Sequence, residues 1–352
     1  MVLVPQYMEW ELYRAAYKLV SELLGLKPDE TIVITADTES DERVINVTAG
    51  AAYHIGAKPL TVWMRASPFG VGKLTDPVIP VEALSALLAN ADVWVEFNYK
   101  WLLYSTTYEN AMSQNRRLRH LCLVGMDVDM MVRVIERVDL QVLRHFQDIL
   151  ADMLRKTRYI RITTPTGTNV EFERSLTGSV LNNKGEAFTP GSHMLPGQIS
   201  VAPIFDSING VIVFDGSVYP PLGLIKEPIK LHIKNGEIVR VEGGEDAIAF
   251  DKWLRGFNHP QMLRLAHLSF GINPGAKLTG NILEDERVWG ATEWGIGYVS
   301  RRLTGSTPIE APSHTDGICL NSSVWLDNVQ ILDKGRYVEP RLAELAKKLN
   351  KQ

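Results

Sequence analysis

The sequence predicts two domains, an N-terminal α/β domain and a C-terminal β-rich domain, and three observations support this prediction. The length of 352 residues favours two domains over one. Up to about residue 156, strand-like apolar segments alternate with segments of helical period. From about residue 158, short strands of alternating polarity dominate. We therefore expect a doubly wound parallel α/β domain over residues 1–156 and a mostly antiparallel, β-rich metal-binding domain over residues 157–352.

The N-terminal domain is expected to contain a sheet covered by helices. Its apolar segments predict strands at residues 31–35, 59–63, 92–97 and 120–124. Segments of helical period predict helices at residues 9–26, 43–56, 81–88, 107–114 and 130–156. Because strands and helices alternate, right-handed crossovers would give a parallel sheet with helices on both faces.

The C-terminal domain is expected to consist mainly of antiparallel strands. Alternating polarity predicts strands at residues 159–163, 170–173, 210–214, 229–233 and 237–241. Asn235-Gly236 is typical of a type I′ turn, which would join the last two strands in a hairpin. One helix is predicted over residues 245–257.

Composition and charge are those of an ordinary globular protein, with 45% hydrophobic and 22% charged residues. The net charge of -4 argues against nucleic acid or an anionic membrane as the main partner. No apolar run approaches the ~18 residues that a membrane span needs, and no secretory signal pattern is present. We therefore expect a cytoplasmic protein. Cys122 and Cys319 lie in apolar, strand-like runs and are expected to be buried thiols.

Two histidines and an aspartate near the C-terminus form the most informative pattern in the chain. His314 and Asp316 are two residues apart, so on an extended strand both side chains point to the same face. His267 lies in another apolar, strand-like segment and could supply a third donor, although a satisfied core histidine is the alternative. Two imidazoles and one carboxylate, with coordination positions left open, are the donor set typical of non-haem iron(II) oxygenases.

Three further residues are candidates for catalysis. Glu293 lies in a strand-like segment next to an aromatic residue and glycines, where it could be a metal ligand, an acid/base group or simply exposed. Gln198 follows the turn signal Pro196-Gly197 and could hydrogen-bond to a bound oxygen species. His193, just before that turn, is a candidate for proton transfer, with an exposed loop histidine as the alternative.

These segments resemble the thermophilic-type metallo-aminopeptidases, the aminopeptidase T or leucyl aminopeptidase group. The resemblance rests on the run from His193 to Pro203, the run from Phe270 to Glu286 and the motif from His314 to Gly317. It spans most of the chain and is strongest between residues 190 and 330. It implies an N-terminal α/β domain, a C-terminal metal-bearing domain and a homo-oligomer.

The metal ligands of those peptidases are only partly retained in this chain. The peptidases hold two divalent metals with two glutamates, two histidines and an aspartate. The resemblance aligns the two glutamates with Gln198 and His267, and the first histidine with Glu293. Only His314 and Asp316 are retained. In its ligand set the chain is therefore more similar to the 2,5-dihydroxypyridine 5,6-dioxygenases, which are ring-cleaving iron(II) enzymes of the same superfamily.

Three functions are left open by the resemblance. The first is an Fe(II)-dependent, extradiol-type dioxygenase that cleaves a dihydroxylated N-heteroaromatic ring, such as 2,5-dihydroxypyridine, with O₂. His267, His314 and Asp316 would hold its metal. The second is a metallo-aminopeptidase or amidohydrolase that uses zinc or cobalt, with Glu293 as ligand or general base. The third is a metal-binding protein with another activity or none.

Overall fold

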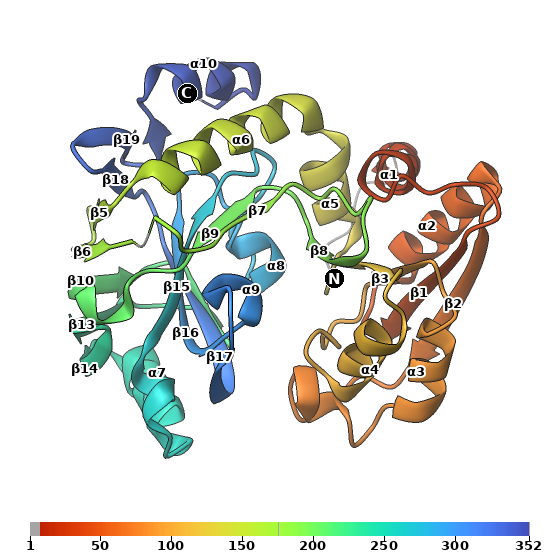
Figure 1. Cartoon of the computed structure of the whole chain (residues 1–352), viewed down its shortest axis with the longest axis horizontal. Coiled ribbons are helices and arrows are strands. Elements are labelled where there is room, and N and C mark those ends of the chain that lie inside the picture. The colour runs from red at the N-terminus through yellow and green to blue at the C-terminus, as the bar shows by residue number, and fades with distance from the viewer. Residues whose placement is uncertain (1–7, 175, 352) are drawn as a thin grey trace. The chain divides into compact units, whose positions relative to one another are not determined.

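The computed structural model describes residues 8–174 and 176–351, which form two compact units. The first unit holds the described residues up to Val138 together with the segment Asn183–Pro196. The second holds Asp139–Asn182 and the described residues from Gly197 onward. One unit carries a parallel sheet with helices and the other carries two large antiparallel sheets, which confirms the predicted fold class (Figure 1).

The first unit is built on five parallel strands in the order β2-β1-β3-β4-β8. These strands are β1 (Thr31–Asp37), β2 (Lys58–Met64), β3 (Val93–Glu96), β4 (Arg119–Cys122) and β8 (Gly191–Met194). The helices are α1 (Met8–Lys18), continued by a π-helical turn (Leu19–Leu23), α2 (Glu42–Ile55), α3 (Val81–Leu88), α4 (Thr106–Gln114) and α5 (Val128–Met131), with a 3₁₀ turn at Gly72–Thr75. The four predicted strands are confirmed. The fifth, β8, was not predicted because its short, mixed sequence has no strand periodicity.

Apolar side chains from the central strands and from α3 and α4 form a core in this unit. Trp94 on β3 is fully buried there, and its indole N–H donates a hydrogen bond to Thr35 Oγ1 at 2.9 Å. The polar edge of the ring is thereby satisfied, as burial of a tryptophan requires. Ser105 begins α4 by accepting a hydrogen bond from the Tyr108 amide, which caps the helix.

The long helix predicted over residues 130–156 is interrupted. The predicted domain boundary near residue 156 also differs from the structure, where the first unit reaches Val138 before the chain enters the second unit. Helix α5 passes into a π-helical turn (Val132–Glu136), and a separate helix α6 (Leu140–Lys156) begins after Asp139. The Asp139 carboxylate accepts hydrogen bonds from the first amides of α6, so a new helix starts here. Because α6 packs into the core of the second unit, the first unit ends at Val138.

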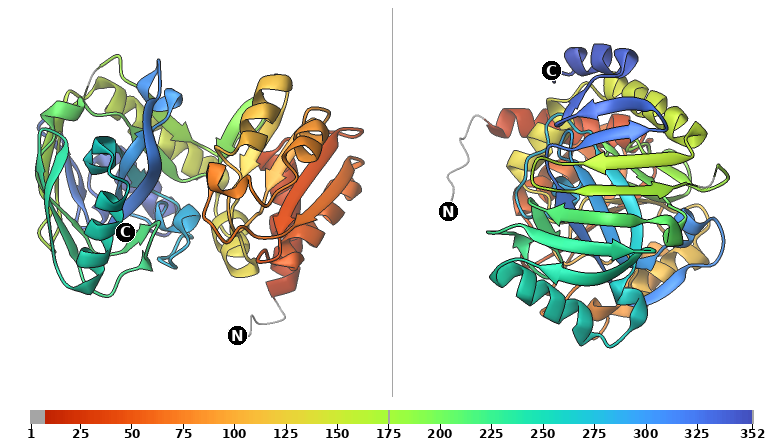
Figure 2. Two further views of the ribbon diagram at one scale, coloured as in Figure 1. Left: turned by 90° about the horizontal axis from the view of Figure 1, so that it is seen from below. Right: turned by 90° about the vertical axis from the view of Figure 1, so that its left-hand side faces the viewer.

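The second unit contains an eight-stranded and a seven-stranded antiparallel sheet. The eight-stranded sheet has the order β14-β13-β10-β6-β5-β18-β19-β20, and the right-hand view of Figure 2 looks onto it. Its strands are β5 (Tyr159–Thr163), β6 (Asn169–Glu173), β10 (Asn209–Phe214), β13 (Ile229–Lys234), β14 (Glu237–Glu242), β18 (Ser323–Leu326), β19 (Val329–Asp333) and β20 (Arg336–Tyr337). The five strands predicted for this domain all lie in this sheet, and the predicted Asn235-Gly236 hairpin joins β13 to β14.

The seven-stranded sheet has the order β12-β11-β17-β16-β15-β9-β7. Its strands are β7 (Val180–Asn183), β9 (Gln198–Val201), β11 (Ser217–Tyr219), β12 (Gly223–Leu224), β15 (Leu265–Gly271), β16 (Thr292–Val299) and β17 (Ile309–Cys319). The remaining helices of the unit are α7 (Glu245–Gly256), α8 (Ile282–Asp285), α9 (Arg301–Thr304) and α10 (Pro340–Lys348), with 3₁₀ turns at Phe205–Ser207 and Pro260–Leu263.

The two sheets of this unit share one apolar core. Phe172 of β6 and Trp294 of β16 meet edge to face there, with ring centroids 5.5 Å apart. Trp294 points to the core, so its neighbours Glu293 and Gly295 point to the other face of the seven-stranded sheet. That outer face carries the candidate site. None of the helices in the described part of the chain has the length and apolar character that crossing a bilayer would require.

Candidate metal centre

The three predicted ligands come together on adjacent strands of the seven-stranded sheet. In its register, Gly295 of β16 lies opposite both His267 of β15 and Asp316 of β17, and Gly297 lies opposite His314. Residues paired across strands face the same side, so both imidazoles and the carboxylate project from one face. One ligand atom from each of the three residues lies within 4.8 Å of the others, which is close enough to share one cation.

His314 and Asp316 contact each other directly. His314 Nε2 lies 2.9 Å from Asp316 Oδ1, and His314 Nδ1 lies 2.7 Å from the carbonyl oxygen of Tyr298. A neutral imidazole that donates its Nδ1 proton to that carbonyl would turn the Nε2 lone pair toward a carboxylate oxygen. Two acceptors that face each other in this way are stabilised either by a proton or by a metal ion between them. A backbone carbonyl that accepts from the other ring nitrogen, here Nδ1, is a usual partner of a metal-binding histidine.

His267 is buried, and its Nδ1 atom has no hydrogen-bond partner among the described residues. Its Nε2 lies 3.0 Å from Glu293 Oε1 and 3.7 Å from Asp316 Oδ1. The pair with Glu293 is close but poorly aligned, since among the described residues neither Glu293 Oε1 nor His267 Nδ1 has a hydrogen-bond partner. Buried polar atoms are rarely left unpaired. The residues present therefore fit a bound cation.

Gly295 leaves the space into which the two imidazoles fit. The rings of His267 and His314 are nearly parallel, with centroids 5.3 Å apart and an interplanar angle of 6°. A Cβ atom at Gly295 would lie 2.3 Å from Cε1 and Nδ1 of His267 and 3.0 Å from Cε1 of His314. A side chain at position 295 would push the His267 ring away. The site therefore requires glycine at this position of β16, the strand between β15 and β17.

Burial and neighbouring charges shift the pKa values in this cluster. Burial disfavours the charged form of His267, but Glu293 and Asp316 outweigh it and raise the pKa of His267 to about 9. Burial raises the pKa of Glu293 to about 7, against the attraction of His267 and with the repulsion of Asp316. Burial opposes ionisation of Asp316 too, yet His314 and His267 hold its pKa below the usual range. The site thus concentrates negative charge that it balances with protons.

Gln198 belongs to a polar network beside the three ligands. It lies on β9, opposite Gly271, and its amide nitrogen donates to Glu286 Oε2 at 2.8 Å and to Glu293 Oε2 at 3.4 Å. Arg287 donates to Gln198 Oε1 at 3.4 Å and also to the Glu286 carboxylate. Glu286 and Arg287 were not predicted. They directly follow the acidic end of α8, and an acidic run ending in arginine was the only signal available.

Two buried serines complete this face of the sheet. Ser269 of β15 donates to Ser200 of β9 at 2.9 Å, two residue pairs along the strands from Gln198 and therefore on the same face. Sequence analysis missed both, because serine is common in strands and its alternation with apolar residues predicts only an amphipathic strand.

His193 lies in the first unit, on β8, and its Nε2 is 2.8 Å from the carbonyl oxygen of Thr189. It is half-buried on a strand and so is not the exposed loop histidine of the alternative interpretation. Its role in proton transfer stays a prediction.

Comparison with known proteins agrees with this fold. Residues 12–339 match the NicX family, described as 2,5-dihydroxypyridine 5,6-dioxygenase. The 2,5-dihydroxypyridine 5,6-dioxygenase of Pseudomonas putida is 24% identical over 345 residues, covering 92% of this chain and 95% of that one. The structure of 2,5-dihydroxypyridine dioxygenase from Pseudomonas putida KT2440 has a TM-score of 0.76 at 19% identity, covering 94% and 98% of the two chains. AmpT (aminopeptidase T) from Thermus thermophilus has a TM-score of 0.66 at 14% identity, covering 94% and 99%.

The chain has the fold shared by AmpT and the dihydroxypyridine dioxygenase, as the resemblance seen in the sequence predicted. By the match of residues 12–339, it belongs to the 2,5-dihydroxypyridine 5,6-dioxygenase family. The family confirms the predicted class of enzyme, a dioxygenase of dihydroxypyridine, and favours it over the aminopeptidase alternative.

Proposed function

We propose that this protein is a mononuclear Fe(II) dioxygenase that opens the ring of 2,5-dihydroxypyridine or a closely related dihydroxylated N-heteroaromatic compound, with O₂ as co-substrate. The observation that carries this proposal is the convergence of His267, His314 and Asp316 on one face of the sheet. Two imidazoles and one carboxylate, with coordination positions left over, are the typical ligand set of non-haem iron(II) oxygenases. Family membership supports the substrate class.

The three ligands would hold the iron through His267, one nitrogen of His314 and the Asp316 carboxylate. Iron(II) bound there would supply redox chemistry with O₂ and a Lewis-acidic centre for the ring hydroxyl. The strands fix these side chains before substrate arrives, because β15, β16 and β17 are paired along the whole site. Such a preformed site avoids the cost of ordering the ligands during the reaction.

Glu293 is the proposed acceptor of the substrate hydroxyl proton. It is buried beside the ligands, and its Oε1 atom lacks a hydrogen-bond partner within the described chain, so it can receive a proton. Its other oxygen, Oε2, accepts from the Gln198 amide. Because Gln198 is already bonded to Glu286, Glu293 and Arg287, we propose that it positions Glu293 rather than binding an oxygen species. His193 remains the second candidate for proton transfer.

Oxygen consumption after anaerobic loading with iron is the decisive experiment. The protein should bind about one iron per chain and consume O₂ with 2,5-dihydroxypyridine while the ring absorbance disappears. His267→Ala should lose both the iron and the activity. His145→Ala is a matched control, since His145 is an exposed histidine on α6, and it should keep both. A protein that takes up two zinc or cobalt ions and hydrolyses aminoacyl-nitroanilides without using O₂ would instead be an aminopeptidase. The homo-oligomer that the resemblance implies belongs to this proposal as well.

A further inference from the structure

Tyr219 extends the row of residues that carries two of the proposed metal ligands. In the register of the seven-stranded sheet, Asp316 of β17 lies opposite Gly295 of β16 on one side and opposite Tyr219 of β11 on the other. His267 of β15 pairs with Gly295 from the far side. The four residues therefore form one row across β15, β16, β17 and β11, which are neighbours in the sheet. Residues paired in this way face the same side, with Cβ atoms about 4.5–5.5 Å apart, so the Tyr219 side chain stands next to that of Asp316.

Burial along β11 agrees with this placement. Val218, the residue before Tyr219, is fully buried in the apolar core that the two sheets share. Successive side chains of a strand point to opposite faces, so Tyr219 points to the outer face, which carries the candidate site. Tyr219 is half-buried on that face.

The backbone on both sides of Tyr219 is anchored. The Leu222 amide donates to the Val218 carbonyl oxygen at 3.0 Å, and the buried Thr315 hydroxyl donates to the carbonyl oxygen of Pro220. Strand β11 is paired with β17 on one edge and with β12 on the other. The strand therefore fixes the starting point of this side chain before a substrate arrives, as a side chain that selects a substrate requires.

The space over Asp316 is where a ring bound at the metal must lie. Because the three ligands project from one face of the sheet, the coordination positions that they leave open face away from the strands. A tyrosine is longer than an aspartate, so the phenol of Tyr219 extends past the carboxylate into this space. It offers a ring two kinds of contact, an aromatic edge or face and a hydroxyl that both donates and accepts.

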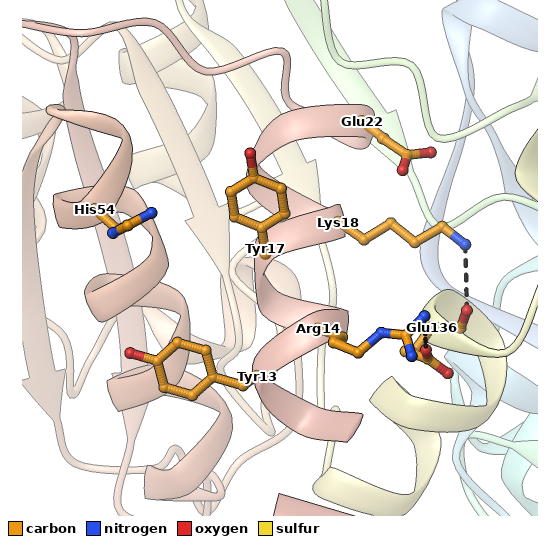
Figure 3. A pocket seen from close by; sticks show the side chains of 7 residues that line it. All are labelled: Tyr13, Arg14, Tyr17, Lys18, Glu22, His54 and Glu136. Carbon is orange, nitrogen blue, oxygen red and sulfur yellow. Dashed lines mark hydrogen bonds and ion pairs between the residues drawn. The ribbon is translucent and has the colours of Figure 1, made fainter. Parts of the chain in front are cut away.

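The tyrosines beside helix α1 do not have this position. Tyr13 and Tyr17 line a hollow of about 490 Å³ in the first unit (Figure 3). The cations of that hollow are engaged within the unit, since Arg14 pairs with Glu136 at 3.0 Å and Lys18 Nζ donates to the Glu136 carbonyl oxygen at 3.2 Å. The metal ligands all belong to the second unit, as Tyr219 does. The ring-binding role is therefore assigned to Tyr219.

We propose that Tyr219 is a specificity-determining residue whose hydroxyl hydrogen-bonds to the oxygen on C2 of a 2,5-dihydroxypyridine ring. This inference rests on the proposed function. The family is named for oxygenation between ring atoms 5 and 6, so the oxygen on C5 lies beside the bond that opens and is the one expected at the metal. The oxygen on C2 lies across the ring and is left for a protein group. A site that hydrogen-bonds to a substrate hydroxyl discriminates against an analogue that lacks it.

A double-mutant cycle between protein and ligand tests the proposal at equilibrium. Anaerobic calorimetry of the iron-loaded protein compares 2,5-dihydroxypyridine with 3-hydroxypyridine, which keeps the oxygen equivalent to that on C5 and lacks the one on C2. Tyr219→Phe should weaken binding of the dihydroxypyridine about fivefold and leave binding of 3-hydroxypyridine unchanged. Tyr219→Leu also removes the aromatic ring, so it should weaken the first compound about thirtyfold and the second about fivefold.

Tyr159→Phe is the matched control, because Tyr159 is an exposed tyrosine on β5 of the eight-stranded sheet. It should bind both compounds as the wild type does. Iron content, measured on the same samples, should be about one per chain in every variant, since Tyr219 is not among the ligands.

Equal weakening of both compounds in Tyr219→Phe would overturn the proposal, because the hydroxyl would then act through the fold and not on the oxygen of C2. Unchanged binding of both compounds, or loss of iron from this variant, would overturn it as well. In these cases an iron-loaded wild type that consumes O₂ with 2,5-dihydroxypyridine would still support the proposed function. A wild-type protein that holds iron and does not bind the dihydroxypyridine would overturn both.

Discussion

Gly295→Ala should remove metal binding while leaving the fold in place. The glycine does not have a positive φ, so the backbone accepts alanine, but the new Cβ would lie 2.3 Å from His267 Cε1 and Nδ1. Ordinary contact begins near 3.4 Å, so the ring must withdraw by about 1.1 Å. Metal–ligand distances tolerate only about 0.2 Å. One ligand is therefore displaced about five times too far, and we expect iron(II) affinity to fall at least about a hundredfold.

The natural control is Gly317→Ala, which adds the same methyl group to the other face of the neighbouring strand. There the new Cβ would lie 2.3 Å from the Phe214 ring, in the apolar core, and no metal ligand would face it. Both variants should lose about 1–3 kcal/mol of stability through overpacking. Only Gly295→Ala should lose the metal.

Anaerobic titration with Fe(II), and with Co(II) as a coloured substitute, measures the affinity, and urea denaturation of the metal-free proteins measures the stability. Wild-type affinity in Gly295→Ala would refute the reasoning, because the site would then tolerate a displaced imidazole. Equal loss of metal in both glycine variants would also refute it, since the loss would then follow from general destabilisation.

Three further predictions concern the buried charges of the second unit. Divalent metal should bind more tightly as pH rises and should release protons, because the metal-free site balances its carboxylates with protons; calorimetry in two buffers of different ionisation enthalpy measures the release. Burial raises the pKa of Asp285 from 3.8 to about 6, so its contribution to stability is full below pH 3.8 and is lost as pH rises through 6. In urea denaturation, the free energy of unfolding of Asp285→Asn relative to wild type should rise by about 3 kcal/mol between pH 3.5 and 7.5. A difference between the two proteins that does not change with pH would contradict this. Arg287→Met leaves the largely buried Glu286 without its cation and should cost about 3–5 kcal/mol in urea denaturation, whereas a loss under 1 kcal/mol would show that the pair is dispensable.

Two of the three ligands could be predicted from strand geometry alone. His314 and Asp316 share a face since they are two residues apart on one strand, and β17 is indeed a strand through both. His267 was harder, because its position depends on β15 lying two strands away in the register that sets it opposite Gly295. Antiparallel register is a long-range property that one sequence does not reveal. His267 was therefore predicted only as a possible third donor, from its apolar, strand-like segment, and the family resemblance supported that assignment.

Other features were beyond sequence reasoning for identifiable reasons. The strand β8 returns to the first unit from a segment far along the chain, and its four residues carry no periodic pattern. The break before α6 was hidden because apolar residues of helical period continue on both sides of Asp139, so only the capping aspartate marked it. Arg287 is fully buried, whereas its charge predicts exposure.

The charges around the ligands explain why a divalent cation suits this face of the sheet. With neutral imidazoles, the cluster contains the three carboxylates of Asp316, Glu293 and Glu286, and the guanidinium of Arg287 is the one cation bonded to them in the described structure. The formal excess is two negative charges in a buried site, which is costly unless it is compensated. Without a metal, the raised pKa values of His267 and Glu293 show compensation by protons. One divalent ion provides the same compensation, and it does so at the point where His267, His314 and Asp316 converge.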